Sequence, residues 1–480
     1  MTQSRSNPSG QHWLSPLIHL SNNWISLAGV VIVTTATIFW LFLLPTTLRG
    51  DTDNPYIGIL AFLALPAPFF AGLVLVPLGM WLKRRREGHP GIYPLDFPAL
   101  AWSNPELRKL AYFVGATTVV NIVVASQLTY GAVNYMDSVT FCGQTCHNVM
   151  QPEFTAYQNS PHSKVECVKC HIGPGASWFV RSKLSGVGQV IAVTFDTYPR
   201  PIPTPVRNLR PARETCEACH WPQKYGEDRV RVISKFADDE HNTLTKTVLL
   251  MKIGGGNGGV GIHGTHLGPG VTIRYAPSDE SRQTIPWVEY DGPSVKRTYV
   301  TKDAKTDGLP IREMDCVDCH NRPTHTYELP ERGIDRVMNA GQIPPSLPFA
   351  KKKAVEILKV NYTSREEAAQ RIPAAWVKYY QDKYPAVWAQ RREEVTGAAQ
   401  QVLAVWDRNV FPAMKVTWGA YPNNLGHTDF PGCFRCHDGA HSTKDNRSIT
   451  QDCNACHNLL AMDEANPKIL GDLGVVEAKH

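Results

Sequence analysis

The chain has 480 residues, 43% of them hydrophobic, and its 49 basic and 43 acidic residues leave a formal net charge of +6. This mild balance gives no strongly basic surface, so no nucleic-acid partner is predicted. The length is sufficient for several domains. Three long segments of the first 130 residues carry no charge, which argues against a wholly water-soluble protein.

These three apolar runs are each long enough to cross a bilayer as a helix: 25–45, 56–82 and 110–130. Four basic residues end the second run and two precede the third, and short loops rich in Lys and Arg stay in the cytoplasm. We therefore predict a cytoplasmic N-terminus over 1–24, a transmembrane hairpin over 25–90 and a third transmembrane helix over 106–136. The first run is too long for a signal-peptide core and is expected to remain as an anchor. A buried helix of the external domain is the alternative for the third run.

All twelve cysteines fall in six units in which a histidine directly follows the second cysteine. The first unit contains one residue more than the other five; the units are Cys142/Cys146/His147, Cys167/Cys170/His171, Cys216/Cys219/His220, Cys316/Cys319/His320, Cys433/Cys436/His437 and Cys453/Cys456/His457. Cys-x-x-Cys-His is the attachment sequence of c-type haem, in which both thiols bond to the porphyrin and the histidine ligates iron from one face. The pattern predicts six covalently bound haems with six proximal iron ligands, and hence an electron carrier outside the cytoplasm.

Two other uses of paired cysteines are disulfides in exported proteins and zinc sites in reducing compartments. Neither explains a histidine after the second cysteine in all six units, because the chain has only 17 histidines. For Cys142 and Cys146, whose spacing is longer, a small disulfide remains an alternative.

Between and after the haem units the pattern changes along the chain. A helix is predicted over 177–193 and an extended proline-rich linker over 199–205. β-branched and alternating residues then predict five strands, at 230–233, 245–253, 271–275, 284–290 and 297–301. The glycine-rich stretch 254–261 lacks the Lys-Ser/Thr of a phosphate loop, so we interpret it as a tight loop beside a haem. Residues 350–408 have helical periodicity, with breaks predicted at Pro373 and Pro385.

The predicted fold class is therefore mainly α, with irregular haem-packed regions, three N-terminal transmembrane helices and an external multihaem domain carrying a small β-rich insert. Its segments are 137–226 with haems one to three, 227–312 as the β-rich insert, 313–346 around haem four, 347–424 as a helical spacer, 425–462 with two haems, and 463–480 as a polar tail.

Eleven histidines remain after the proximal ligands. The iron of an electron-transfer haem has a second strong axial ligand opposite the proximal histidine, whereas a catalytic haem leaves that coordination position open. The candidate distal ligands are His162, His263, His266, His325, His427 and His441. A surface or hydrogen-bonding role is the alternative for each, His241 is a weaker candidate, and His12, His19, His89 and His480 are assigned no role. Met150, close after His147, is a candidate ligand of the first iron, with a packed core methionine as the alternative.

The residues around the first two units resemble the NapC/NirT family over about 108–225. The matching stretches are Asp137-Ser-Val-Thr-Phe-Cys142, Cys146-His-Asn-Val-Met-Gln-Pro-Glu153, Ser160-Pro-His162, Lys183 and Phe195-Asp-Thr197. Members of this family are membrane-anchored multihaem cytochromes that oxidise quinol and pass electrons to periplasmic partners. The resemblance implies a first haem at the membrane surface, with Met150 as a ligand and Lys183 and Asp196 lining the quinol site. The chain departs from the family in its longer first unit, the position of Met150, the helical hairpin, the β-rich insert and the C-terminal portion.

The leading hypothesis is a quinol dehydrogenase of the bacterial inner membrane, with its haem domain in the periplasm. Asp196 or Glu153 would accept protons and Lys183 would hydrogen-bond the quinone oxygen, although a propionate contact or a helix cap is the alternative for Asp196 and Lys183. Its partners would be the quinone pool, a periplasmic cytochrome or terminal reductase, and further membrane subunits.

Two other functions compete with this hypothesis. A non-enzymatic conduit within a larger membrane redox complex is the second hypothesis. A terminal reductase is the third, and the absence of any Cys-x-x-Cys-Lys unit disfavours it.

Overall fold

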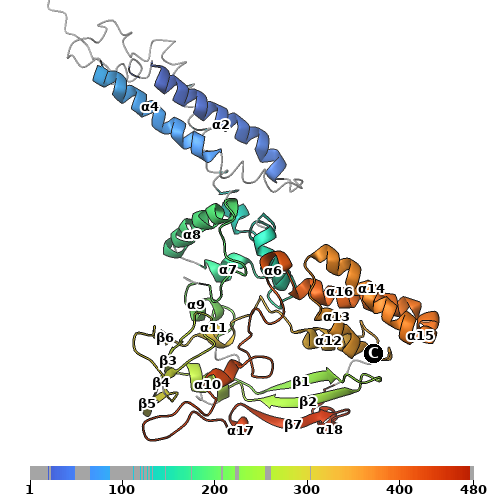
Figure 1. The fold of residues 1–480 in the computed structure, drawn as a ribbon. Helices are drawn as coiled ribbons and strands as arrows, with labels where there is room; N and C mark the ends of the chain where they lie inside the picture. The colour runs from blue at the N-terminus through green and yellow to red at the C-terminus, as the bar shows by residue number, and fades with distance from the viewer. Residues whose placement is uncertain are drawn as a thin grey trace, which may run out of the picture. The chain divides into compact units, whose positions relative to one another are not determined.

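The structure is a computed structural model, and it describes residues 20, 23–48, 65–86, 112, 119, 123, 127, 130–131, 133–145, 147–173, 176–206, 209–221, 226–254, 261–302 and 304–475. The chain divides into two compact units, Met1–Thr145 and Cys146–His480 (Figure 1).

The first unit contains two long helices, α2 (Trp24–Leu48) and α4 (Pro66–Arg86), which pack against each other. The two helices are in close contact at Gly29 and Gly72. A Cβ atom added at Gly29 would lie only 2.7 Å from the carbonyl oxygen of Gly72, so a larger side chain would not fit there. Small residues permit such close packing of membrane helices. Within the described residues, α4 is the one helix classed as long and apolar enough to cross a membrane, and its last turn is basic. The predicted third transmembrane segment lies largely outside the described residues.

The second unit begins with helices around the first haem units: α6 (His147–Gln158), α7 (Cys167–His171), α8 (Ala176–Thr194) and α9 (Ala212–Cys216). Helix α8 confirms the predicted helix over 177–193. The proline-rich segment 199–205 contains no helix or strand, as predicted.

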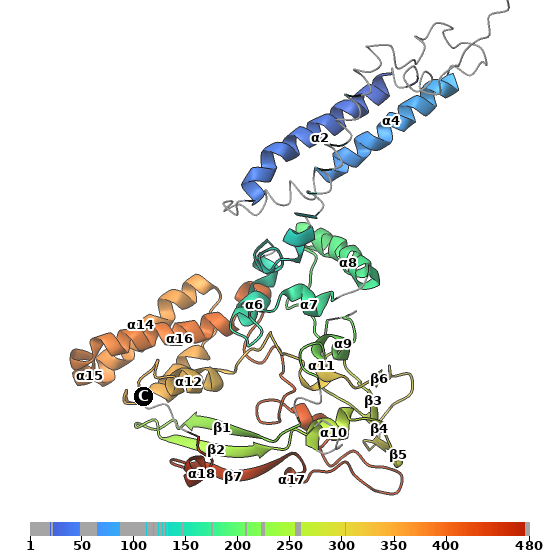
Figure 2. The same ribbon diagram turned by 180° about the vertical axis from the view of Figure 1, so that it is seen from behind.

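Two antiparallel sheets follow, one on each side of α10 (Gly261–Leu267) in the views of Figures 1 and 2. The first has the order β1 (Arg229–Phe236), β2 (Leu244–Met251), β7 (His457–Glu464). The second has the order β5 (Val295–Val300), β4 (Trp287–Gly292), β3 (Thr272–Ala276), β6 (Arg312–Glu313). The five predicted strands coincide with β1 to β5. The insert does not supply all the strands, however: β7, which begins in the last haem unit and lies mostly in the predicted two-haem segment 425–462, completes the first sheet.

A helical module contains the largest apolar core of the described chain. It consists of α12 (Pro330–Asn339), α13 (Ala350–Leu358), α14 (Arg365–Lys383), α15 (Pro385–Gln390) and α16 (Arg392–Asn409). Pro385 begins α15 as expected for a proline at the first helical position. The predicted break at Pro373 is wrong: α14 continues through it, with Ile372 and Trp376 fully buried on either side. Burial of this face outweighs the one backbone hydrogen bond that proline removes.

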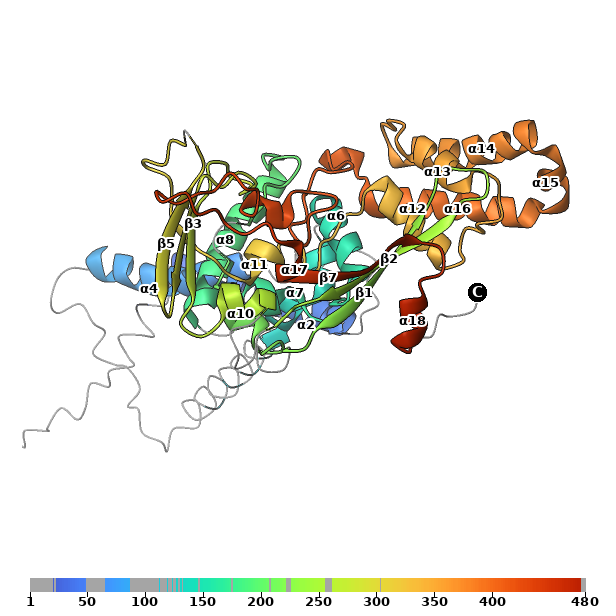
Figure 3. The same cartoon turned by 90° about the horizontal axis from the view of Figure 1, so that it is seen from below.

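The remaining elements are short. They are η2, a π-helical turn (Phe141–Thr145), α11 (Cys316–Cys319), η4 (Pro412–Met414), η5 (Gly432–Arg435), α17 (Cys453–Cys456) and α18 (Lys468–Asp472). Seen from below in Figure 3, α10, α11 and α17 lie between the four-stranded sheet and the helical module. Two haem-unit segments, α11 and α17, and the histidine-bearing helix α10 are thus held between separately packed scaffolds.

Candidate haem sites

Each of the five regular units contains a short helical turn at its first cysteine. In three of them the backbone N–H of the histidine donates a hydrogen bond to the backbone carbonyl oxygen of the first cysteine. The N–O distances are 2.7 Å for His220, 2.8 Å for His320 and 3.1 Å for His437. Residues three apart on such a turn lie side by side. Both thiols of a unit therefore lie near its histidine, as covalent haem attachment requires.

The proximal histidines of the five regular units each have a second histidine facing them. The ring centroids are 6.3 Å apart for His171 and His325, 5.9 Å for His162 and His220, 6.3 Å for His263 and His320, 5.8 Å for His266 and His437, and 6.2 Å for His427 and His457. Two imidazoles on opposite faces of one metal, each bonded at about 2 Å, have ring centres roughly 6 Å apart. The residues present therefore fit five irons with two histidine ligands each.

The orientation of several of these rings is fixed through Nδ1. This nitrogen is hydrogen-bonded to a backbone carbonyl oxygen in four of them: His162 to Pro323 at 3.3 Å, His266 to Ile262 at 2.7 Å, His325 to Glu153 at 3.0 Å, and His437 to Thr450 at 2.7 Å. A bond of this kind sets the tautomer and leaves Nε2 for a metal. His457 is an exception, since its buried Nδ1 has no hydrogen-bond partner in the described part of the chain.

Burial favours the neutral form of three of these rings, His171, His266 and His320. Burial, followed by the neighbouring His325, lowers the pKa of His171 to about 4. Burial likewise lowers the pKa of His266 and of His320, in each case with a facing or neighbouring histidine adding to the effect. Neutral imidazole is the form that binds iron.

The second to sixth units follow one another in space in their order along the chain. Helix α9 of the third unit contacts both α7 of the second and α11 of the fourth. Burial and then Cys216 raise the pKa of the Cys170 thiol, and burial raises that of Cys319 to about 11 with Cys433 contributing. Burial and then Cys433 raise the pKa of Cys456. These interactions join the second unit to the third, the fourth to the fifth and the fifth to the sixth.

The alternatives of zinc and disulfides find no support in the described residues. No disulfide joins two of the eleven cysteines that the structure describes, and Cys146, the partner of Cys142 in the small-disulfide alternative, lies outside them. In the same part of the chain, no three His, Cys, Asp or Glu side chains converge as a zinc site requires.

His441 differs from the other candidate distal ligands. Its ring is 1% exposed, and both nitrogens are hydrogen-bonded, Nδ1 to Asp438 at 2.8 Å and Nε2 to the carbonyl oxygen of Ile285 at 2.6 Å. This arrangement favours the hydrogen-bonding alternative for His441 over iron ligation. His241 is exposed next to the turn between β1 and β2. Met150 lies on α6 three residues after His147, whose side chain is outside the described part.

The candidate quinol residues are not brought together by any described contact. Asp196 is exposed at the end of α8, has a left-handed backbone (φ 54°), and pairs with Arg200. The hydrogen bond from Arg200 lowers the pKa of Asp196. Glu153 instead accepts a hydrogen bond from Tyr327 Oη at 2.9 Å, and its Oε2 lies 3.4 Å from His325 Nδ1. The side chain of Lys183 lies outside the described residues.

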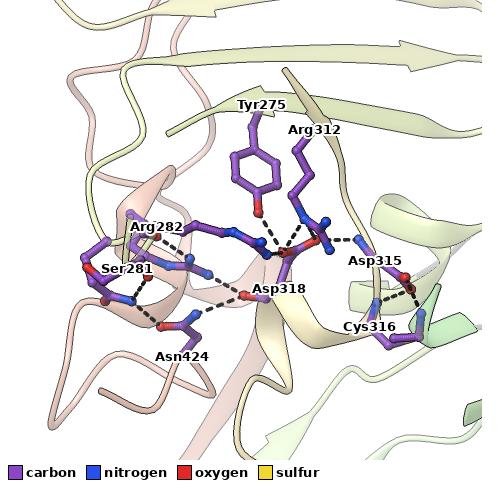
Figure 4. Close-up of polar contacts among 11 residues, drawn as sticks. Tyr275, Ser281, Arg282, Arg312, Asp315, Cys316, Asp318 and Asn424 are labelled. Carbon is purple, nitrogen blue, oxygen red and sulfur yellow. Dashed lines mark hydrogen bonds and ion pairs between the residues drawn. The ribbon is translucent and has the colours of Figure 1, made fainter. Parts of the chain in front are cut away.

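Sequence reasoning missed the polar residues that connect the units. Asp318, inside the fourth unit, is 3% exposed and accepts hydrogen bonds from Tyr275 Oη at 2.6 Å and Arg312 Nε at 3.0 Å (Figure 4). Arg435, inside the fifth unit, donates to the carbonyl oxygen of Asp318 at 2.6 Å. Among these connecting residues, only Asp315 could have been noticed in the sequence. It directly precedes a short helix, and aspartate is a favoured N-cap residue.

Paired cysteines beside five facing histidine pairs define a multihaem c-type cytochrome. Residues 105–201 match the model of the NapC/NirT cytochrome c family, N-terminal region. The chain is also 41% identical over 452 residues to the cytochrome c-type protein ImcH of Geobacter sulfurreducens, and the match covers 92% of this chain and 89% of that protein. The chain belongs to the NapC/NirT family of multihaem cytochromes, and its haem iron is covalently bound. No solved structure matches it.

Proposed function

We propose that this protein is a three-pass, membrane-anchored hexahaem cytochrome c that accepts electrons from membrane quinol at its first haem and relays them to a periplasmic acceptor. The five facing histidine pairs carry the proposal, because six-coordinate irons exchange electrons without binding substrate. The membrane helices, the basic end of α4 and the family membership support the placement of the quinol end.

When bound, the haems supply one-electron carriers, and the chain sets what each iron can do. His325, His162, His263, His266 and His427 would fill the distal positions of the second to sixth irons, in that order. A filled position leaves no place for an oxyanion or other substrate, which disfavours the terminal-reductase hypothesis.

The first unit is proposed to hold the sixth haem despite its longer spacing. The additional residue falls in the π-helical turn Phe141–Thr145. A π-helical turn contains one residue more than an α-helical turn, so it can absorb an insertion without displacing the helix after it. His147 would be its proximal ligand and Met150 its candidate distal ligand.

Quinol oxidation releases two protons as well as two electrons, so the site needs a proton acceptor. Asp196 and Lys183 remain the candidates, within the family-matched segment. Because Arg200 lowers its pKa, Asp196 is a weak base until that ion pair opens. Glu153, held against His325 and Tyr327, suits the positioning of a distal ligand better than proton transfer.

The full-length chain, purified in detergent and oxidised, tests this proposal when it is mixed with a water-soluble quinol. We expect reduced haem bands that a quinone-site inhibitor abolishes, and slower reduction in Asp196→Asn. The matched control is Asp291→Asn, which changes another aspartate paired with a basic side chain, Lys296, whose Nζ lies 3.0 Å away. If dithionite reduces the haems and quinol does not, the protein is an electron conduit whose partner handles quinone.

A further inference from the structure

One carboxylate joins the helices of the third and fourth haem units. Asp315 lies directly before α11, and its Oδ1 accepts a hydrogen bond from the backbone N–H of Cys316 at 2.6 Å. The same carboxylate accepts from two backbone N–H groups at the start of α9, those of Ala212 at 2.7 Å and Arg213 at 3.0 Å. Asp315 thus caps the first turns of two helices that are about a hundred residues apart in sequence.

The shared cap brings the two cofactor attachment points into contact. Helix α9 ends at Cys216 and packs against α11, which begins at Cys316, so the first cysteines of the two units lie on helices in direct contact. Thioether bonds at Cys216 and Cys316 would therefore attach the two porphyrins to neighbouring helices.

Asp315 is itself held in a rigid setting. Its N–H donates to Asp318 Oδ2 at 2.7 Å, completing the capping box of α11. Asp318 is fixed by Tyr275 of β3 and Arg312 of β6, so the chain of contacts runs from the four-stranded sheet through α11 to α9 (Figure 4). The relative position of the third and fourth units is therefore built into the fold.

We propose that Asp315 is a positioning residue that fixes the third and fourth haems as a close, strongly interacting pair and so sets the rate of electron transfer between them. The inference rests on the proposed electron-relay function. In the step concerned, one iron passes from Fe(II) to Fe(III) while its neighbour passes from Fe(III) to Fe(II), and no bond or proton changes place. Asp315 acts only by holding the helices that carry the two attachment sites.

The test compares Asp315→Ala, Asp315→Asn and a control in the full-length protein. The control, Asp239→Ala, also removes a carboxylate that accepts a backbone N–H bond, from Thr243 at 2.8 Å, but does so in the turn between β1 and β2. Asparagine keeps Oδ1, the acceptor for the N–H groups of Cys316 and Arg213, but places an NH2 donor where Oδ2 accepts from Ala212, so Asp315→Asn should be intermediate.

Three readouts are needed: haem content by intact mass, magnetic coupling between haems by electron paramagnetic resonance, and internal electron transfer after photoreduction, which requires no quinol. In Asp315→Ala we expect unchanged haem content, a weakened coupling signal and a rate slower by on the order of tenfold. Asp239→Ala should lose comparable thermal stability with coupling and rate unchanged. Unchanged coupling and rate in a stably folded Asp315→Ala would overturn the proposal, whereas failure of quinol reduction alone would leave it standing.

Discussion

The ring of His325, which follows the fourth haem unit in sequence, faces the ring of His171 of the second unit with centroids 6.3 Å apart. The carbonyl oxygen of Glu153 accepts a hydrogen bond from His325 Nδ1 at 3.0 Å, which orients the ring. A residue from one haem segment therefore completes the surroundings of another, and sequence proximity does not reveal which iron a histidine serves.

The first prediction is that His325→Ala alters the second haem and leaves the fourth unchanged. Loss of the distal imidazole should convert one low-spin signal to high-spin in the paramagnetic resonance spectrum. In a Cys167→Ala/Cys170→Ala background, which lacks the second haem, His325→Ala should have no further effect. A high-spin signal that persists in that background would assign His325 to another iron.

The second prediction concerns α10, whose His263 and His266 face the proximal histidines of the fourth and fifth units. His263→Ala and His266→Ala should each produce one high-spin iron, and the double variant should produce two. Spin quantification against total haem measures this directly. If the double variant resembled either single variant, both histidines would serve one iron. His241→Ala, an exposed histidine nearby in sequence, is the control.

The third prediction is that His441→Ala leaves the number of low-spin irons unchanged but destabilises the protein. The substitution leaves the buried carbonyl oxygen of Ile285 without its 2.6 Å hydrogen bond from His441, whereas Asp438 keeps the backbone N–H groups of Ala440 and residue 441 as donors. An unsatisfied buried polar group costs about 1–3 kcal/mol, so chemical unfolding should begin at lower denaturant concentration. A new high-spin signal would contradict this assignment.

The fourth prediction distinguishes Glu153 from Asp196, the two carboxylates that the sequence offers as proton acceptors for quinol. Glu153→Gln removes a negative charge beside His325 and should raise the reduction potential of the second haem, by roughly 1 kcal/mol in reduction free energy. Asp196→Asn, far more exposed, should slow quinol oxidation without that shift. Spectroelectrochemical titration of both variants measures the potentials. The reverse pattern would return Glu153 to the quinol site.

Much of the architecture was predictable because its signals are local. The spacing of Cys216, Cys219 and His220 follows from the chemistry of one haem, and strands β1 to β5 follow from short β-branched segments. The pairing of β2 with β7 was not predictable, because β7 begins at His457 of the last haem unit and the partners meet only in the folded chain. The surroundings of His441 were unpredictable for a similar reason: its position shortly after Cys436 favoured a ligand, whereas its hydrogen bond to Ile285, distant in sequence, favours the hydrogen-bonding alternative.

The position of His325 also constrains how the protein is made. Cofactor attachment at Cys167 and Cys170 needs only the local segment, whereas the second axial bond proposed for that iron needs residues that emerge later from the ribosome and, in the proposed topology, would cross the membrane later. The second centre would therefore remain five-coordinate during biogenesis until translocation has passed residue 325. A chain shortened after the third unit would export a reactive, open iron in place of an electron carrier.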